Sequence, residues 1–172
     1  YGGWITIFSD GIKDTFISKM DDSLLIEKTN GLTFDSQGNL YACEYGKGKI
    51  LKIDDKNKIE VYADGYYGKR FNRPNDLTFD LFGNLYFTDP NSYDKNILDG
   101  RIFLVDAKTK EVILLEDSLA FPNGINISPI DHKLYICESV FNRVLRYEIT
   151  KDNRLSNKKV FAVMLGHHRN MF

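Results

Sequence analysis

The sequence has little cysteine, proline or tryptophan. Only 2 of its 172 residues are Cys, 4 are Pro and 1 is Trp. The two cysteines, Cys43 and Cys137, are too few for a disulfide framework, and their number fits a reducing compartment equally well. We expect both to be buried small residues.

Segments that would direct the chain to a membrane are also missing. No apolar stretch approaches the roughly 20 residues that a membrane-spanning helix needs. Residues 1–10 lack the charged start and the cleavage site of a signal peptide. We therefore expect a cytoplasmic protein without a membrane partner.

The chain has no excess of charge of one sign. It has 23 Lys and Arg against 24 Asp and Glu, which gives a formal net charge of -1. Because the basic residues are scattered, they form no electrostatic footprint for nucleic acid or for an anionic membrane. A composition of 42% hydrophobic and 27% charged residues is typical of a soluble globular protein. A small molecule is therefore the expected partner.

The sequence does contain an internal repeat. Motifs that begin with Asn-Gly or Asn-Asp occur at Asn30, Asn75 and Asn123, at spacings of 45 and 48 residues. A turn and three further apolar segments follow each motif. The predicted strands are 30–35, 38–44, 49–54 and 59–63 in the first repeat, 75–80, 83–89, 101–106 and 111–115 in the second, and 123–128, 132–138, 143–148 and 159–163 in the third.

These segments predict an all-β fold, namely a β-propeller. They are short, rich in Val, Ile, Leu, Tyr and Phe, and separated by Gly, Asn and Asp, as is typical of strands. Four antiparallel strands per repeat of this length indicate one propeller blade. Stacked blades need two apolar faces, and the third strands provide them. One face is formed by Leu51, Phe103 and Leu145, and the other by Ile50, Ile102 and Val144.

The expected organisation is a single partial propeller domain over residues 1–172. Its blades would span 1–29, 30–74, 75–122 and 123–172, and the first blade would have only its second, third and fourth strands, at 5–10, 16–20 and 24–27. About 3.75 blades cannot close a ring, since propellers have four to eight. We therefore expect a truncated chain.

An acidic residue closes every predicted second strand. Its recurrence at an outward strand end favours a structural role over a metal site. The four residues are Asp10, Glu44, Asp89 and Glu138.

The repeat starts resemble those of a known enzyme family. The stretch Arg73-Pro74-Asn75-Asp76 followed by Gly83 to Pro90, and the later stretch Phe121 to Ile125, are similar to corresponding stretches of bacterial gluconolactonases. The similarity to the gluconolactonase/SMP-30/regucalcin family extends from Trp4 to about Val163, with the blade order preserved. This resemblance implies a six-bladed propeller in the complete protein.

The same resemblance implies an activity and a site. Family members open sugar lactones with one divalent cation in the central channel, most often Ca²⁺, with Zn²⁺ or Mg²⁺ as alternatives. By position, Asn75 and Asn123 match two Asn ligands of that cation, and Arg73 matches a substrate-contacting Arg. The family's Glu ligand would lie before Tyr1, and its Asp ligand, the proposed catalytic base, beyond Phe172. We therefore expect the chain to be inactive by itself.

Alternatives to this interpretation remain open at the level of the sequence. The family also includes phosphotriesterase-like hydrolases, and a propeller can serve as a non-catalytic binding platform. Asn is a common turn residue, so the repeated Asn30, Asn75 and Asn123 could simply stabilise local backbone. Equivalent positions of successive blades nevertheless meet at one channel mouth. We therefore expect Asn30 to line the channel and to bind the lactone substrate together with Arg73.

Overall fold

The computed structural model describes residues 4–18 and 25–164. These residues form strands and turns, and no helix among them is long and apolar enough to cross a membrane. Three sheets have four strands each, and a fourth has two. All neighbouring strands are antiparallel.

Each four-stranded sheet follows chain order, so that successive strands pair with one another. The two-stranded sheet consists of β1 (Trp4–Ser9) and β2 (Ile12–Ser18). The next sheet consists of β3 (Thr29–Phe34), β4 (Leu40–Glu44), β5 (Lys49–Ile53) and β6 (Ile59–Ala63). It is followed by β7 (Leu77–Phe79), β8 (Leu85–Asp89), β9 (Gly100–Val105) and β10 (Val112–Leu119). The last sheet consists of β11 (Pro122–Ile127), β12 (Leu134–Glu138), β13 (Arg143–Ile149) and β14 (Leu155–Val163).

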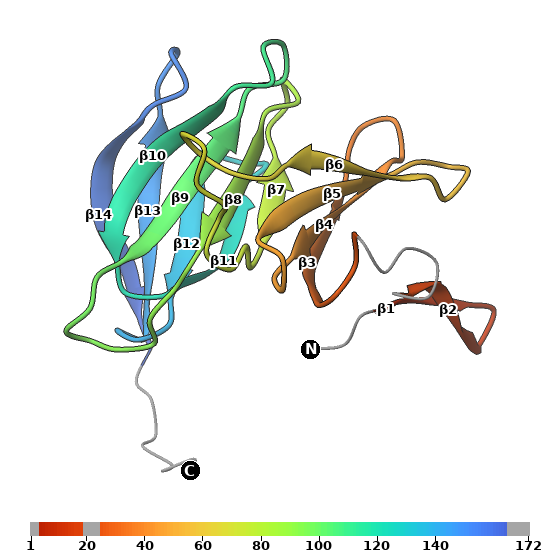
Figure 1. The fold of residues 1–172 in the computed structure, drawn as a ribbon. Coiled ribbons are helices and arrows are strands. Elements are labelled where there is room, and N and C mark those ends of the chain that lie inside the picture. The colour runs from red at the N-terminus through yellow and green to blue at the C-terminus, as the bar shows by residue number, and fades with distance from the viewer. Residues whose placement is uncertain (1–3, 19–24, 165–172) are drawn as a thin grey trace.

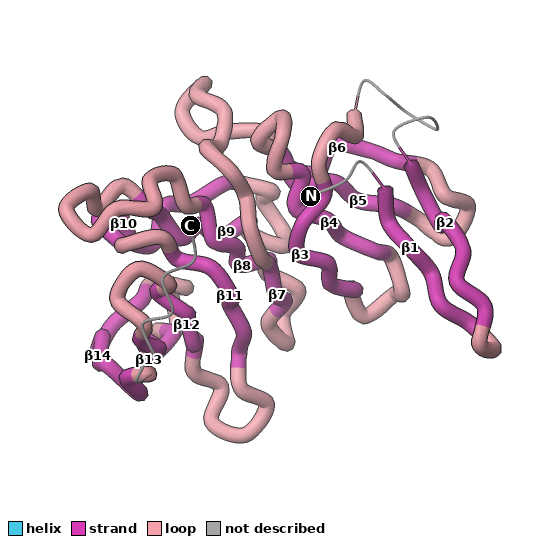
Figure 2. The backbone as a smooth tube through the Cα atoms, turned by 90° about the horizontal axis from the view of Figure 1, so that it is seen from below, coloured by secondary structure: helices cyan, strands magenta, loops and turns pink. Residues whose placement is uncertain are grey.

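The sheets stand side by side in chain order, and their innermost strands β3, β7 and β11 are neighbours (Figures 1 and 2). This arrangement, with four antiparallel strands per sheet, is that of β-propeller blades. The predicted fold class is confirmed. The sheets do not close into a ring within the described residues.

The hydrophobic core lies between the sheets. Alternate residues of one strand face opposite neighbours, as the pleat requires. Thus Leu51 packs toward the β1–β2 sheet, whereas Ile50 packs toward the β7–β10 sheet. On β9, Phe103 likewise packs toward the β3–β6 sheet and Ile102 toward the β11–β14 sheet. Each interface between sheets is therefore a small core of its own.

The first sheet corrects a prediction. The strand predicted at 16–20 is β2, which begins at Ile12 rather than at 16. Residues 25–28, where the repeat predicts the next strand, form no strand, and residues 19–24 lie outside the described part. The reason is a tight turn in which Asp10 and Gly11 both have positive φ, 52° and 79°, and Ser9 pairs with Ile12. An Asp-Gly pair is a recognised signal for such a hairpin, so the sequence contained the information.

Candidate active site at the start of the inner strands

The three repeated motifs meet at one end of the inner strands. The Gly31 N–H donates to the Asn75 carbonyl at 2.8 Å, which joins β3 to the segment that leads into β7. The Thr88 hydroxyl donates to the Asn123 carbonyl at 2.6 Å, which joins β8 to β11. The starts of the inner strands are therefore linked to the neighbouring blades by hydrogen bonds to the backbone carbonyls of Asn75 and Asn123.

Asp76 lies at the same junction and was missed by sequence reasoning. One of its carboxylate oxygens, Oδ2, accepts the Ile125 N–H at 3.0 Å, so the side chain bridges two blades. Its carbonyl accepts the Thr88 N–H at 3.0 Å. The signal was present, because the second repeat has Asn-Asp where the others have Asn-Gly. The second repeat thus has a carboxylate at a position where the other repeats have no side chain.

The side chains of the three Asn residues differ in their surroundings. Asn75 is buried, with 4% of its surface exposed, and Asn123 is half-buried. Asn30 is also half-buried, and its buried Nδ2 has no hydrogen-bond partner among the described residues. Because this nitrogen is a donor, it suits an oxygen of a substrate rather than a cation.

Arg73 is exposed beside this junction, and its guanidinium carbon lies 5.7 Å from the centre of the Tyr45 ring. Its backbone is held in place, since the Arg73 N–H donates to Asp89 Oδ1 at 2.7 Å. A fixed backbone with an exposed guanidinium can present its fork of donors to a carboxylate or hydroxyl group.

The buried Asp89 clamps the loop that carries Arg73. It also accepts the Asn72 N–H at 3.1 Å and pairs with Arg101 Nη2 at 2.6 Å. Burial raises the pKa of Asp89, while the N–H donors of Asn72 and Arg73 and the Arg101 charge act in the opposite direction. Its burial and its three protein donors indicate a structural carboxylate.

Two other acidic strand ends form the same clamp. Glu44 accepts the backbone N–H groups of Glu27, Lys28 and Lys47. Glu138 accepts the Ala120 N–H at 2.7 Å and pairs with Arg143 at 2.5 Å. The structural interpretation is confirmed for these residues. Asp10 does not form this clamp, since it is exposed in the β1–β2 turn and accepts the Ser9 hydroxyl.

The cysteines are both free thiols, but only Cys43 is buried. Burial raises the pKa of the Cys43 thiol, and the negative charges of Asp76 and Asp89 raise it further. Cys137 is exposed, which corrects the prediction that both are buried. Cys43 packs in the core between two sheets, whereas among the described residues no sheet follows the one that carries Cys137.

The described residues do not form a complete metal site. No group of three or more His, Cys, Asp or Glu side chains that could hold a metal ion occurs in residues 4–18 and 25–164. Amide oxygens of Asn75 and Asn123 are suitable ligands for a hard cation, but they carry no charge to offset its own. They would be part of a larger set.

Thr88 is the buried link between Asp76 and Asn123, and we expect its removal to loosen the junction. In Thr88→Val, the Asp76 N–H would lose its 3.2 Å contact with the hydroxyl, and the Asn123 carbonyl would lose its donor. Buried groups left without partners cost about 1–3 kcal/mol, so the free energy of unfolding should fall by that amount. Urea denaturation would measure it. Thr88→Ser, which keeps the hydroxyl, is the control, and an equal loss in both variants would contradict the hydrogen-bond explanation.

The four-stranded antiparallel sheets, which lie side by side with their inner strands adjacent, define the class of protein as a β-propeller. The family model described as "SMP-30/Gluconolactonase/LRE-like region" matches residues 15–170. The chain therefore belongs to the SMP-30/gluconolactonase family.

Individual relatives agree with this assignment. A gluconolactonase of Zymomonas mobilis is 34% identical over 120 residues, which cover 64% of this chain and 33% of the relative. Protein STRICTOSIDINE SYNTHASE-LIKE 4 of Arabidopsis thaliana is 31% identical over 132 residues, covering 71% of this chain and 36% of the relative. The solved structure of a gluconolactonase from Xanthomonas campestris has a TM-score of 0.75 and 26% identity, over 91% of this chain and 54% of that chain. This chain thus spans about a third of these curated relatives and about half of that solved structure.

Proposed function

We propose that the complete protein is a divalent-metal-dependent hydrolase that opens a sugar lactone. The observation that carries the proposal is the junction of the repeat starts, where Asn75 and Asn123 join neighbouring blades in a chain of the gluconolactonase family. A bound cation would polarise the carbonyl of the lactone. We propose Ca²⁺ first, with Zn²⁺ or Mg²⁺ as alternatives.

The chain's own residues would bind and orient the substrate. The amide oxygens of Asn75 and Asn123 would be two of the cation's ligands. The unpaired Asn30 Nδ2 would donate to a lactone oxygen, and Arg73 would hold a hydroxyl or carboxylate group with its fixed donors. No group of three or more His, Cys, Asp or Glu side chains that could hold a metal ion occurs among the described residues, and we propose that this chain has no lactonase activity by itself.

The test is hydrolysis of glucono-1,5-lactone by the product of the complete reading frame, with Ca²⁺ and after chelation. We expect activity to disappear with the metal and to return when it is restored. Asn75→Ala and Asn123→Ala should each lower kcat/KM by at least about 10–100-fold, the loss seen even for outer-shell partners of metals. Asn96→Ala, in an exposed loop, is the matched control and should keep full activity.

Two other results would contradict the proposal. Metal-dependent hydrolysis of phosphotriesters without hydrolysis of lactones would favour the phosphotriesterase-like alternative. Absence of both metal binding and hydrolysis over a panel of lactones and phosphotriesters would favour a binding platform.

A further inference from the structure

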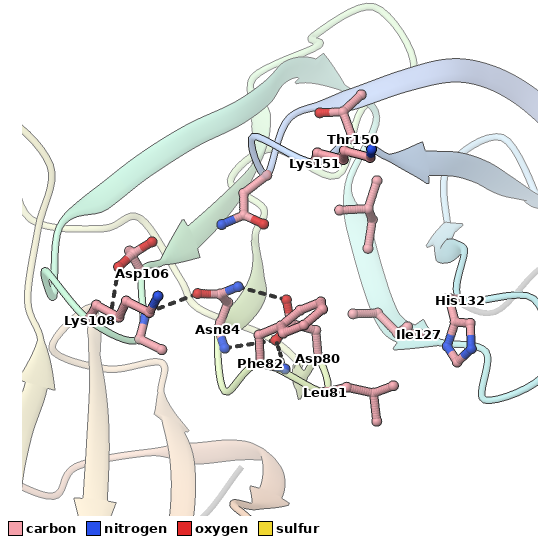
Figure 3. A pocket seen from close by; sticks show the side chains of 13 residues that line it. Asp80, Leu81, Phe82, Asn84, Asp106, Lys108, Ile127, His132, Thr150 and Lys151 are labelled. Carbon is pink, nitrogen blue, oxygen red and sulfur yellow. Dashed lines mark hydrogen bonds between the residues drawn. The ribbon is translucent and has the colours of Figure 1, made fainter.

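A cavity of about 740 Å³ is lined by the side chains drawn in Figure 3, which include Asp80, Phe82 and Lys108. It lies between the β7–β10 and β11–β14 sheets, and its walls include the turns at 80–84, 106–108 and 149–153. The chain passes from Asn75 to Asp80 along β7, and five residues at about 3.3 Å each place the two sites roughly 16 Å apart. The cavity is therefore separate from the candidate active site.

One wall is a turn that has a close counterpart in the preceding blade. In the turns 35–39 and 80–84, the Asp carboxylate accepts two backbone N–H groups and the side-chain N–H of the closing Asn. The distances are 2.9, 2.9 and 2.8 Å in the first turn and 2.8, 2.9 and 2.8 Å in the second. Gly38 and Gly83 have φ values of 85° and 84°. The backbone is thus the same in both blades.

The two turns differ at their tips. The first has Ser36-Gln37, the usual polar chemistry of an exposed turn, whereas the second has Leu81-Phe82. Leu81 is 83% exposed and Phe82 84% exposed. Because the polar pair supports the same geometry, the turn itself does not require apolar residues. An exposed apolar pair at the edge of a cavity is typical of a binding surface.

The charged groups around the cavity favour an anion. The carboxylate of Asp80 accepts four hydrogen bonds, and that of Asp106 accepts the N–H groups of Lys108 and Thr109. The Lys108 and Lys151 ammonium groups form no ion pair with the described residues. The carboxylates are thus engaged by their own turns. The turn's hydrogen bonds and, more weakly, the Lys108 charge lower the pKa of Asp106, but neither ammonium group lies within ion-pair distance of a described carboxylate.

We propose that this cavity binds a small amphipathic anion, a molecule with an aromatic or aliphatic body and one carboxylate. The body packs against Leu81, Phe82 and Ile127, and the carboxylate pairs with Lys108 and Lys151. The volume lies within the range of about 300–1,000 Å³ that is usual for small-molecule pockets, which favours such a ligand over a protein surface. The site is independent of the proposed lactonase activity.

The test uses 1-naphthoate as the probe, titrated into this chain by isothermal calorimetry. We expect saturable binding of one molecule per chain. The variant Leu81→Ser/Phe82→Gln copies the tip of the preceding blade, so it should weaken binding at least about tenfold without changing the midpoint of thermal unfolding. Phe8→Ser removes an exposed aromatic residue from the β1–β2 hairpin and should leave the affinity unchanged.

A second pair of variants tests whether binding requires the positive charge of Lys108. Lys108→Glu should weaken binding of 1-naphthoate at least about tenfold, because it opposes the carboxylate. Lys56→Glu is the control, because Lys56 holds the same place in its own turn. The Lys56 N–H donates to Asp54 and the Lys108 N–H to Asp106, both at 2.9 Å. The neutral analogue 1-naphthalenemethanol should bind more weakly than the acid.

Several outcomes would overturn the proposal. They are an absence of saturable binding, equal affinity for the acid and the alcohol, and unchanged binding by the Leu81→Ser/Phe82→Gln variant. A change in sedimentation of that variant without naphthoate binding would instead assign the apolar tip to contact with a second copy. Pelleting with phosphatidylserine vesicles that the variant abolishes, again without naphthoate binding, would assign it to a lipid surface.

Discussion

Replacement of Asp89 by alanine should lower the free energy of unfolding by about 3–5 kcal/mol, the usual cost of removing one partner of a buried ion pair. Asp89 has 0% of its surface exposed and accepts hydrogen bonds from the Arg101 side chain and from two backbone N–H groups. The substitution leaves all three donors without their acceptor. Guanidinium chloride denaturation, analysed for both midpoint and slope, would measure the loss.

Asp10→Ala is the matched control for this prediction. Asp10 holds the same place in the repeated sequence pattern but is exposed in a hairpin turn. Its removal should lower the free energy of unfolding by about 1–2 kcal/mol, the cost of the left-handed conformation that the φ of 52° imposes on alanine. If Asp89→Ala proved as mild as Asp10→Ala, the loop before β7 would have to be held by other contacts.

Gly31→Ala should destabilise the junction of the repeat starts by about 1–3 kcal/mol, the range for overpacking a close contact. A Cβ on Gly31 would lie 2.6 Å from Asp76 Oδ1 and 2.7 Å from the Asn75 carbonyl oxygen. Because part of this contact is backbone, it cannot be relieved by a rotamer change. The strand β3 and the segment that carries Asn75 would have to separate, so the proposed lactonase activity of the complete protein should fall as well.

Gly124→Ala is the corresponding change in a later repeat and tests the same point. A Cβ there would meet Cys137 Sγ at 3.5 Å and Asp76 Oδ2 at 3.8 Å, which are ordinary contacts. We expect the unfolding midpoint of Gly124→Ala to remain close to that of the unsubstituted chain. Equal destabilisation by both substitutions would mean that these glycines are needed for their backbone conformation rather than for space.

The parts of the fold that depend on local pattern were predictable. The alternation of Ile50 with Leu51 and of Ile102 with Phe103 requires strands with two apolar faces, and the structure places these residues in different cores. The first sheet departs from the repeat because the Asp10-Gly11 turn moves the second strand of that hairpin forward to Ile12.

The candidate site was predictable only in outline. The recurrence of Asn30, Asn75 and Asn123 indicated residues that converge, because equivalent positions of stacked blades share one end of the sheets. The Asn-Asp of the second repeat marks Asp76 as different from the glycine of the other repeats, but it does not show what Asp76 contacts. Its carboxylate matters through the Ile125 N–H, a group 49 positions further along the chain.

The sequence by itself determined the repeat, the strands and the two apolar faces of each blade, because these follow from side-chain alternation and turn chemistry within a few residues. Only the tertiary structure decided what the neighbouring sheet covers or leaves open. Cys43 is buried while Cys137 is exposed, and Leu81 and Phe82 border a cavity. The physical reason is that burial and hydrogen-bond partners between blades depend on side chains far apart in sequence, which local pattern does not specify.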